Sequence, residues 1–197
     1  MGQPMGGKNQ EVYQMIKKIT FITNSPGKAE EAQKILGNEL QIILKKIDLE
    51  EIQTIDGKQV IKKKVKEAYK ILKKPVMVED TSLYFDGWNG LPGALVRWFL
   101  DSVGCEGICK MAKGLTNRTI KAESAIAFYD GKRIKIVSSQ LEGSLPNTPR
   151  GKYKFGWDPI FIPKGYSKTF AEMGSEEKNK ISMRKLALEK LRVYLTR

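Results

Sequence analysis

The stretch Lys18-Ile19-Thr20-Phe21-Ile22-Thr23-Asn24-Ser25-Pro26-Gly27 decides the fold class of this chain of 197 residues. Its first part is rich in β-branched and aromatic side chains and predicts a β-strand, whereas Asn24 to Gly27 is typical of a turn. An amphipathic helix follows and ends at Gly37, and its inward face holds Ala29, Ala32, Ile35 and Leu36. A strand, a short loop and a helix in succession favour an α/β protein.

The rest of the chain continues this alternation. We expect strands at 41–47 and 76–78, and helices at 60–72, 94–103, 106–113 and 183–195. Residues 121–129 and 132–141, joined by Asp130-Gly131, carry the clearest hairpin signal, and an antiparallel hairpin beside parallel units predicts a mixed sheet. We predict a flexible N-terminal segment at 1–16 and a single domain over 17–197.

Composition excludes several kinds of chemistry. The chain has 35 Lys and Arg against 22 Asp and Glu and no histidine, so its formal charge at pH 7 is +13. Without an imidazole, Ser-His-Asp and Cys-His nucleophiles, paired-histidine zinc sites and histidine bases are excluded. Cys105 and Cys109 are too few for a disulfide framework and are predicted to be small apolar residues in a reducing compartment. No apolar run is long enough to span a membrane, so we expect a cytoplasmic protein without a membrane partner.

The loop before the first helix is a candidate anion site. Backbone N–H groups at a helix N-terminus favour a negative charge, and Lys28 adds a positive side chain. An ordinary strand-to-helix turn explains the same residues. Lys64, which borders the apolar stripe of helix 60–72, is a second cation that can point toward a ligand.

Two consecutive acids end the apolar strand at 76–78. Neighbouring side chains of a strand point to opposite faces, so Asp80, in register with Val78, would face a cleft and Glu79 would not. With a second acid from Glu50 or Glu51, such carboxylates suit Mg²⁺. Solvated acids at the end of a strand are the alternative.

Two further features point to a flat, hydrogen-bonding ligand. Phe155-Gly156-Trp157-Asp158 places aromatics and an acid in a loop, which suits stacking on a nucleobase or capping of a core. Arg184 falls in the first turn of the last helix if Ser182 is its N-cap, and a cation there opposes the helix dipole. That placement indicates an anionic or hydrogen-bond-accepting partner.

Taken in order, four blocks of the chain resemble the inosine triphosphate pyrophosphatase family, which acts on noncanonical purine nucleoside triphosphates. The blocks are Phe21 to Glu30; Val78 to Thr81 with Gly90 to Gly93; Phe155 to Pro159; and Glu177 to Asn179 with Ser182 to Arg184. The resemblance implies an α/β fold with an elongated, twisted mixed β-sheet flanked by helices, two lobes around a substrate cleft, and a homodimer. It also implies hydrolysis of ITP, dITP and XTP to the monophosphate and pyrophosphate with Mg²⁺, with Mn²⁺ as a substitute.

The resemblance also implies roles for single residues. Asp80 would be the catalytic carboxylate, a metal ligand and a substrate contact, and Glu51 would be the second metal-binding acid. The triphosphate would be held by Thr23, Asn24, Ser25, Pro26, Gly27, Lys28, Lys64, Thr81 and Arg97, the last at a family lysine position. The base would be held by Phe155, Gly156, Trp157, Asp158, Lys178, Ser182, Met183 and Arg184. The chain departs from the family pattern at Asn24-Ser25, where the family has Gly-Asn, and at Met183, where it has His.

The alternative is a basic single-domain nucleic-acid-binding protein without hydrolase activity, suggested by the charge and the loop aromatics. Only seven of the 35 basic residues are arginine, the side chain that suits bidentate phosphate and base contacts. This alternative also leaves Glu79 and Asp80 without a role. We therefore interpret the positive charge as serving a triphosphate cleft within a lysine-rich surface.

Overall fold

The structure is a computed structural model, and it describes residues 16–38, 40–152 and 156–196. Two sequence predictions lie outside these residues: the flexible segment at 1–16, apart from its last residue, and the contact from Phe155. Within the described residues, no helix combines the length and the apolar character that crossing a bilayer requires.

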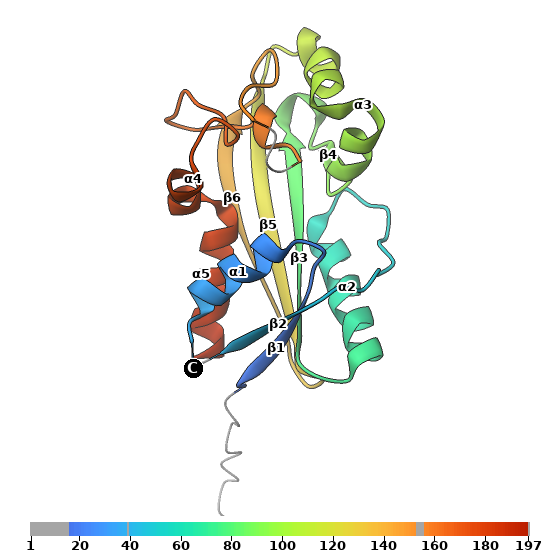
Figure 1. Cartoon of the computed structure of the whole chain (residues 1–197). Helices are drawn as coiled ribbons and strands as arrows, with labels where there is room; N and C mark the ends of the chain where they lie inside the picture. The colour runs from blue at the N-terminus through green and yellow to red at the C-terminus, as the bar shows by residue number, and fades with distance from the viewer. Residues whose placement is uncertain (1–15, 39, 153–155, 197) are drawn as a thin grey trace, which may run out of the picture.

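A seven-stranded mixed sheet forms the frame, in the order β2-β1-β3-β5-β6-β7, with β4 paired to β3. β1 (Lys18–Ile22) lies parallel to both β2 (Gln41–Lys45) and β3 (Val76–Phe85). The antiparallel part continues through β5 (Thr119–Tyr129), β6 (Ile134–Ser144) and β7 (Ile162–Pro163), while β4 (Pro92–Gly93) pairs with the end of β3. Figure 1 shows that β3, β5 and β6 run along the length of an elongated molecule. The predicted mixed α/β fold is confirmed.

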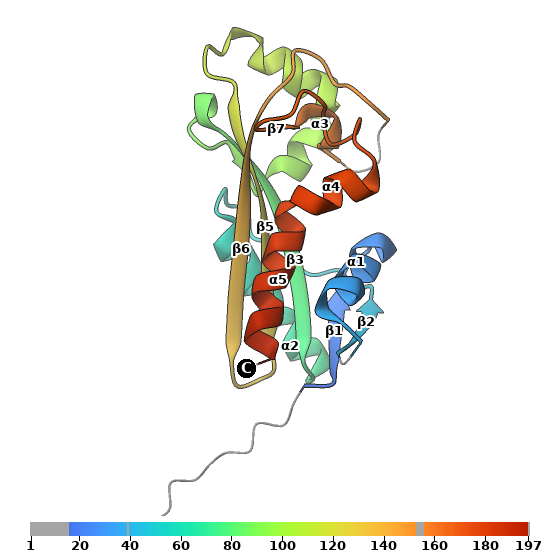
Figure 2. The ribbon, with the colours of Figure 1, turned by 90° about the vertical axis from the view of Figure 1, so that its left-hand side faces the viewer.

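Helices cover both faces of the long strands in the lower half of Figure 1. α1 (Pro26–Leu36) and α5 (Met183–Leu195) pack on one face, over side chains that include Phe21, Met77 and Phe128. α2 (Gly57–Leu72) packs on the other face, over side chains that include Val76 and Val78. Because a strand alternates its side chains, β3 contributes to both cores. Figure 2 shows α5 and α1 side by side along the sheet.

A third core fills the upper half. α3 (Val96–Met111) and α4 (Ser175–Ile181) lie there, and the core side chains include Phe85, Ile108, Trp157 and Phe161. Gly104, with φ of 65°, interrupts α3 and confirms the prediction of two short helices in succession. Cys105 and Cys109 are free and buried in this core, as predicted, and burial raises their pKa values to about 12 and about 11.

The strand predicted at 76–78 is longer than its sequence indicated, and its predicted end is wrong. β3 continues to Phe85 because β5 pairs with all of it, from Val76 opposite Tyr129 to Phe85 opposite Ile120. Glu79 and Asp80 therefore lie in the middle of a strand, and their side chains are 2% and 14% exposed. Solvated acids at a strand end are excluded.

Candidate functional site

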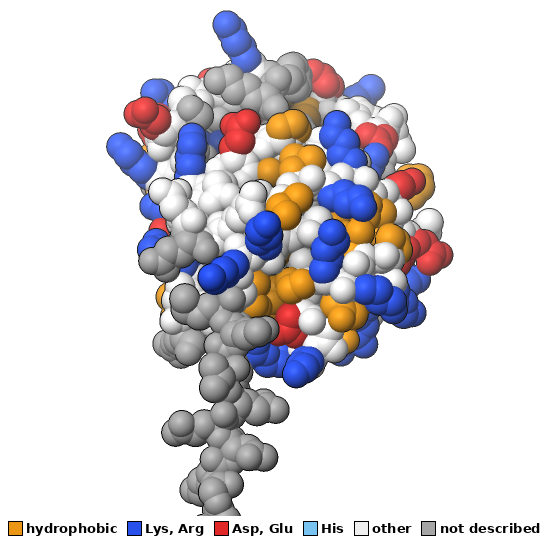
Figure 3. All heavy atoms as spheres, turned by 60° about the horizontal axis from the view of Figure 1, so that its bottom comes forward, with side chains coloured by type: hydrophobic (Ala, Val, Ile, Leu, Met, Phe, Trp, Pro, Cys, Tyr) orange, Lys and Arg blue, Asp and Glu red, His pale blue; other side chains and the backbone are white. Residues whose placement is uncertain are grey.

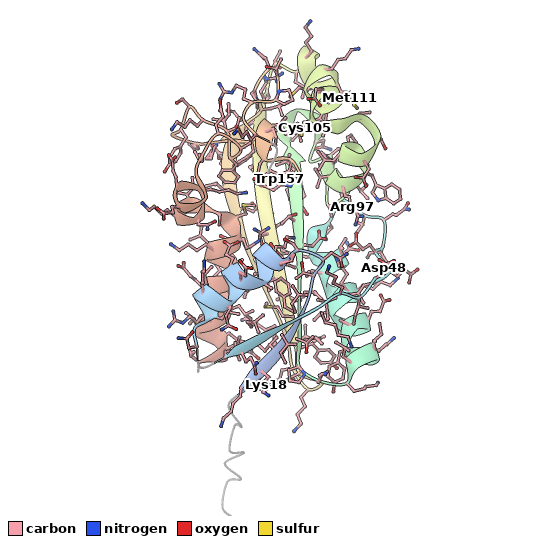
Figure 4. The ribbon with its side chains drawn as sticks, in the orientation of Figure 1. Lys18, Asp48, Arg97, Cys105, Met111 and Trp157 are labelled. Atoms are coloured by element: carbon pink, nitrogen blue, oxygen red, sulfur yellow. The ribbon has the colours of Figure 1, made fainter. Side chains whose placement is uncertain are left out.

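A cleft of about 500 Å³ opens beside the middle of β3. Its walls come from the β1–α1 loop, the segment after β2, α2, β3, the first turns of α3 and the loop at 156–157. Figure 4 labels Asp48, Arg97 and Trp157, which come from three of these walls. The predicted site residues that line the cleft are Thr23, Asn24, Ser25, Lys28, Glu51, Lys64, Asp80, Thr81, Arg97, Gly156 and Trp157.

Asp80 faces α2, as its register with Val78 predicts, and meets the amine of Lys64. The Nζ atom of Lys64 lies 3.4 Å from Oδ1 of Asp80 and 2.6 Å from Oε1 of Glu51. Within the described residues, Oδ2 of Asp80 is buried and has no hydrogen-bond partner. Burial, with a further contribution from Glu51, raises the pKa of Asp80 to about 6 against the opposing effect of Lys64. Asp80 is thus a carboxyl that changes charge near neutrality while facing a cleft.

Lys64 is the shared counter-ion of the two carboxylates. Burial alone would lower the pKa of its ammonium group, but Asp80 and Glu51 raise it above the ordinary value. The cation is therefore fixed at the point where the two acids converge, within reach of any anion in the cleft.

Glu79 points to the opposite face of β3 and enters a different cluster. It nevertheless lines the cleft, as does its ion-pair partner Lys28, so the prediction that Glu79 would not face the cleft is wrong. Its Oε1 accepts hydrogen bonds from Nε of Arg184 at 2.7 Å and from the hydroxyl of Ser124 at 3.0 Å, and Nζ of Lys28 lies 3.3 Å from Oε2. Burial opposes ionisation, yet Arg184 and Lys28 lower the pKa of Glu79 to about 2. Nη1 of Arg184 also donates to Glu31 at 3.1 Å. The anionic partner predicted for Arg184 is thus supplied within the chain.

The β1–α1 loop has the geometry of a helix start that opens on the cleft. Ser25 is the N-cap of α1 and accepts from the Lys28 N–H at 3.4 Å, and the Thr23 hydroxyl accepts from the Ser25 N–H at 3.1 Å. Among the described residues with a side chain, only Lys73 and Asn89 have positive φ. Asn24 is therefore unstrained where the family has glycine, and that departure leaves the turn intact.

Several predicted base contacts do not line the cleft. Asp158 is buried and paired with Lys178, whose amine also lies 5.1 Å from the centre of the Phe170 ring. Met183 is buried in the upper core, and Ser182 caps α5 by accepting from the Lys185 N–H at 3.2 Å. The predicted residues absent from the described lining are Pro26, Gly27, Asp158, Lys178, Ser182, Met183 and Arg184.

The lining also contains residues that the sequence did not single out as site residues: Ile22, Ile47, Asp48, Leu49, Glu79, Ala94, Val96, Leu100 and Asp101. Asp48 had a signal, because it opens the acidic stretch that supplies Glu51. No sequence signal marked Asp101, because the hydrophobic pattern of α3 does not indicate which of its exposed residues face the cleft. Among the described lining residues, three cations face five carboxylates, so the positive charge of the chain is not concentrated in the cleft.

The cleft has oxygen donors that fit a divalent cation. Asp80 offers a buried Oδ2 that has no hydrogen-bond partner in the described part of the chain, and the Glu51 side chain beside it is 44% exposed. Within the described residues, no group of three or more His, Cys, Asp or Glu side chains is arranged to hold a metal ion. Two carboxylates suit Mg²⁺, which retains waters and shares itself with substrate phosphates.

Comparison with known proteins agrees with this geometry. The model of the Ham1 family matches residues 19–194. The inosine triphosphate pyrophosphatase of Yarrowia lipolytica is 44% identical over 181 residues, covering 90% of this chain and 95% of that protein. The protein of the same name from Schizosaccharomyces pombe is 39% identical over 183 residues, covering 92% and 96%.

Solved structures of Ham1 proteins are also similar to this chain. The Staphylococcus aureus Ham1 protein superposes with a TM-score of 0.82 at 25% identity, covering 91% of this chain and 98% of that one. A HAM1 protein from Coxiella burnetii has a TM-score of 0.82 at 26% identity, covering 92% and 99%. The likeness therefore extends over both halves of the molecule and the cleft between them.

Proposed function

The chain belongs to the Ham1 family, and from that premise we propose that it hydrolyses ITP, dITP and XTP to the nucleoside monophosphate and pyrophosphate. Such an activity removes deaminated purines from the nucleotide pool. The relatives named inosine triphosphate pyrophosphatase support the substrate class. Within the structure, the observation that carries the proposal is Asp80, a buried carboxyl with a pKa of about 6 that faces the cleft beside Lys64.

We propose that the triphosphate lies along the cleft between α1 and α2. The N-terminus of α1 and the amines of Lys28 and Lys64 line this path and attract phosphate oxygens. Thr81 adds a hydroxyl donor, and Arg97 adds a charge from the α3 side. The same contacts hold the α-phosphorus close to Asp80.

Asp80 acts as the proton acceptor in this proposal. Water attacks the α-phosphorus, the bond from that phosphorus to the bridging oxygen breaks, and pyrophosphate leaves with the bond electrons. The proton of the attacking water passes to the Asp80 carboxylate, whose Oδ2 has no hydrogen-bond partner within the described residues. A carboxyl with a pKa of about 6 is mostly ionised at neutral pH and remains an effective base.

We propose that the reaction requires Mg²⁺, with Mn²⁺ as a substitute, held by Asp80 and Glu51. When bound, the metal supplies positive charge to the phosphate oxygens. The ammonium group of Lys64 contacts both acids and holds them close together.

Base selection is proposed to rest on Arg184. Trp157 lines the cleft, but it is 2% exposed and packs against Phe161 and Phe170, so it supports the wall of the base subsite and does not present its ring for stacking. Arg184 would donate to the 6-keto oxygen of hypoxanthine or xanthine, which adenine lacks. A guanidinium carries five N–H donors, so its hydrogen bonds to Glu79 and Glu31 are compatible with a further acceptor. Asp158, Lys178, Ser182 and Met183 remain predicted contacts or supports of this subsite.

The products of ITP turnover test the reaction type. We expect purified protein with ITP and Mg²⁺ to yield IMP and pyrophosphate, separated by anion-exchange chromatography. ATP serves as the matched substrate, because its 6-amino group leaves the Arg184 donor unpaired, and it should turn over much more slowly. Formation of IDP with inorganic phosphate, or no turnover of ITP, would refute the proposal.

We also propose that the enzyme is a homodimer and acts in the cytoplasm. The buried, free thiols of Cys105 and Cys109 are compatible with a reducing compartment. Light scattering after size-exclusion chromatography should give twice the mass of the 22.3 kDa chain. A mass that stays at that of one chain at all concentrations would contradict the dimer.

A further inference from the structure

The cleft does not account for the charge of the protein. The chain carries a formal charge of +13, yet the described lining of the cleft holds more carboxylates than cations. Most of the positive side chains therefore lie elsewhere on the surface. The lower end of the molecule, as drawn in Figure 1, is where three segments bring several of them together.

Strand register places these segments at one end of the sheet. Thr20 in β1 lies opposite Val76, the first residue of β3, and Val76 lies opposite Tyr129, the last residue of β5. The start of β1, the link from α2 to β3 and the β5–β6 turn therefore meet at the same edge. A side chain at Gly131 in the turn would collide with the hydroxyl of Tyr69, so the turn touches the last part of α2.

Seven exposed cations come from these segments, and we call them the basic end: Lys17, Lys18, Lys70, Lys73, Lys74, Lys132 and Arg133. The nearby acid, Asp130, is 12% exposed and is already paired with Arg133 at 3.0 Å. Figure 4 labels Lys18 at this end. Figure 3, which brings the end forward, shows Lys and Arg side chains spread among hydrophobic ones.

Stabilisation of a helix end explains the position of only some of the cations in the basic end. Lys70 and Lys73 lie at the C-terminus of α2, where cations interact favourably with the helix dipole. Lys17, Lys18 and Lys132 lie outside any helix, so no helix dipole stabilises their charges. Seven like charges also repel one another, so their concentration at one end calls for a partner.

We propose that the basic end docks the protein on the surface of an acidic phospholipid bilayer. Six of the seven cations are lysines, and Ile71, 53% exposed, lies among them, a combination that suits a lipid interface. A nucleic acid fits this end less well than a lipid surface does. The aromatic rings here, Tyr69 and Tyr129, pack against each other with their ring centres 4.6 Å apart, so they are not presented for stacking on bases. The sequence predicted no membrane partner because nothing can span a bilayer, but peripheral docking needs no span.

Docking at this end leaves the cleft open. Asp80 is four positions along β3 from Val76 at the basic end, which is roughly 13 Å of extended chain. None of the seven cations of the basic end lines the cleft, which also has walls from α3 and the β1–α1 loop. The bound protein can therefore still take up a soluble nucleotide.

Sedimentation with vesicles tests this surface. The full chain should bind phosphatidylcholine vesicles that contain phosphatidylserine, should ignore vesicles of phosphatidylcholine alone, and should be released by salt. The variant Lys70→Glu/Lys74→Glu/Lys132→Glu should lose at least about 100-fold in vesicle affinity, since removing each lysine charge near an acidic surface costs roughly fivefold and the new carboxylates add repulsion. Its turnover of ITP should be unchanged, and its thermal unfolding should remain cooperative.

A second triple variant controls for net charge. Lys113→Glu/Lys168→Glu/Lys180→Glu reverses three exposed lysines away from the basic end, so it has the same total charge as the first variant. It should keep most of the vesicle affinity. Equal losses in the two variants, equal binding to both kinds of vesicle, or binding to single-stranded RNA without binding to acidic vesicles would overturn the proposal.

Discussion

At the scale of single residues, two adjacent acids show how the face of a strand determines chemistry. Glu79 and Asp80 are neighbours on β3, yet the pKa of one is about 2 and of the other about 6. Glu79 meets Arg184 and Lys28 on the α1 and α5 face, whereas Asp80 meets Lys64 and a second carboxylate on the α2 face. One acid is held permanently charged, and the other can exchange a proton.

Replacing Asp80 by Asn removes the proposed proton acceptor but keeps the shape of the side chain. We expect Asp80→Asn to lower the turnover of ITP by at least about 100-fold, the usual contribution of a general base. The Glu79→Asp variant is not a suitable control because it disturbs the buried cluster, so the exposed Asp86→Asn serves instead. Near-normal turnover of a folded Asp80→Asn protein would remove Asp80 from the mechanism.

The raised pKa of Asp80 also predicts how stability depends on pH. The Asp80 carboxyl binds its proton more tightly in the folded state than in the unfolded chain. Its contribution therefore lowers the free energy of unfolding as pH rises from the ordinary pKa of an Asp toward about 6. Relative to the wild type, Asp80→Asn should gain about 2 kcal/mol in free energy of unfolding between about pH 4 and about pH 7. Urea denaturation at both pH values measures this difference, and a constant difference would contradict the raised pKa.

The cluster around Glu79 predicts a large loss of stability when one cation is removed. Arg184→Leu leaves the carboxylates of Glu79 and Glu31 buried without that partner and should cost about 3 to 5 kcal/mol in free energy of unfolding. In the double variant Glu79→Gln/Arg184→Leu, part of that loss should be recovered. A cost below about 1 kcal/mol for Arg184→Leu, by urea denaturation, would show that the charges are solvated.

At the scale of elements, one helix holds in place the segment that carries Glu51. Residues 46–53 have no regular secondary structure, although they carry Glu51. Within the described residues, the single hydrogen bond to a main-chain group of 47–53 runs from the Glu50 N–H to Oε1 of Glu67 in α2, at 3.2 Å. Leu49 anchors the same segment in the core against α2. α2 therefore positions both Lys64 and the proposed metal-binding acid.

Loss of the Glu67 acceptor should weaken metal binding more than catalysis. We expect Glu67→Leu to raise the Mg²⁺ concentration for half-maximal activity about 10-fold, with little change in turnover at saturating Mg²⁺. Glu67→Gln retains Oε1 and should restore the affinity. Lys63→Met removes only the exposed contact to the Glu50 side chain and should have no effect.

Amide hydrogen exchange tests this role of Glu67 without any assay of activity. The Glu50 amide should exchange faster in Glu67→Leu than in the wild type and in Glu67→Gln. If Glu50 exchanges at the same rate in all three proteins, Glu67 does not hold the segment.

At the scale of the whole molecule, three separate hydrophobic cores stabilise the fold. Two cores lie on opposite faces of the lower strands, and the third fills the upper half around Trp157 and α3. The cleft lies where the upper and lower parts meet, so its lining comes from elements of both. The long strands β3 and β5 pass through both parts and join them, which explains why Asp80, in mid-strand, faces the boundary.

The sequence predicted the local features because short-range patterns encode them. The register of Asp80 with Val78, the N-cap role of Ser182 and the break of α3 near Gly104 are all confirmed. The predicted length of β3 was wrong. The strand continues through polar residues, which are extended because they pair with β5. The site roles taken from the family resemblance stay predictions, including the base contacts at Lys178 and Met183.

The sequence by itself determined that this is a mixed α/β protein whose chemistry cannot use histidine. Only the tertiary structure decided which charges meet. Arg184 reaches Glu79 across 105 positions of the chain, and Lys64 is placed between Asp80 and Glu51. The tertiary structure also separates the positive charge of the basic end from the acidic cleft. Local patterns encode periodicity and turns, but contacts between distant residues depend on strand order and helix docking, which follow from the burial of three cores at once.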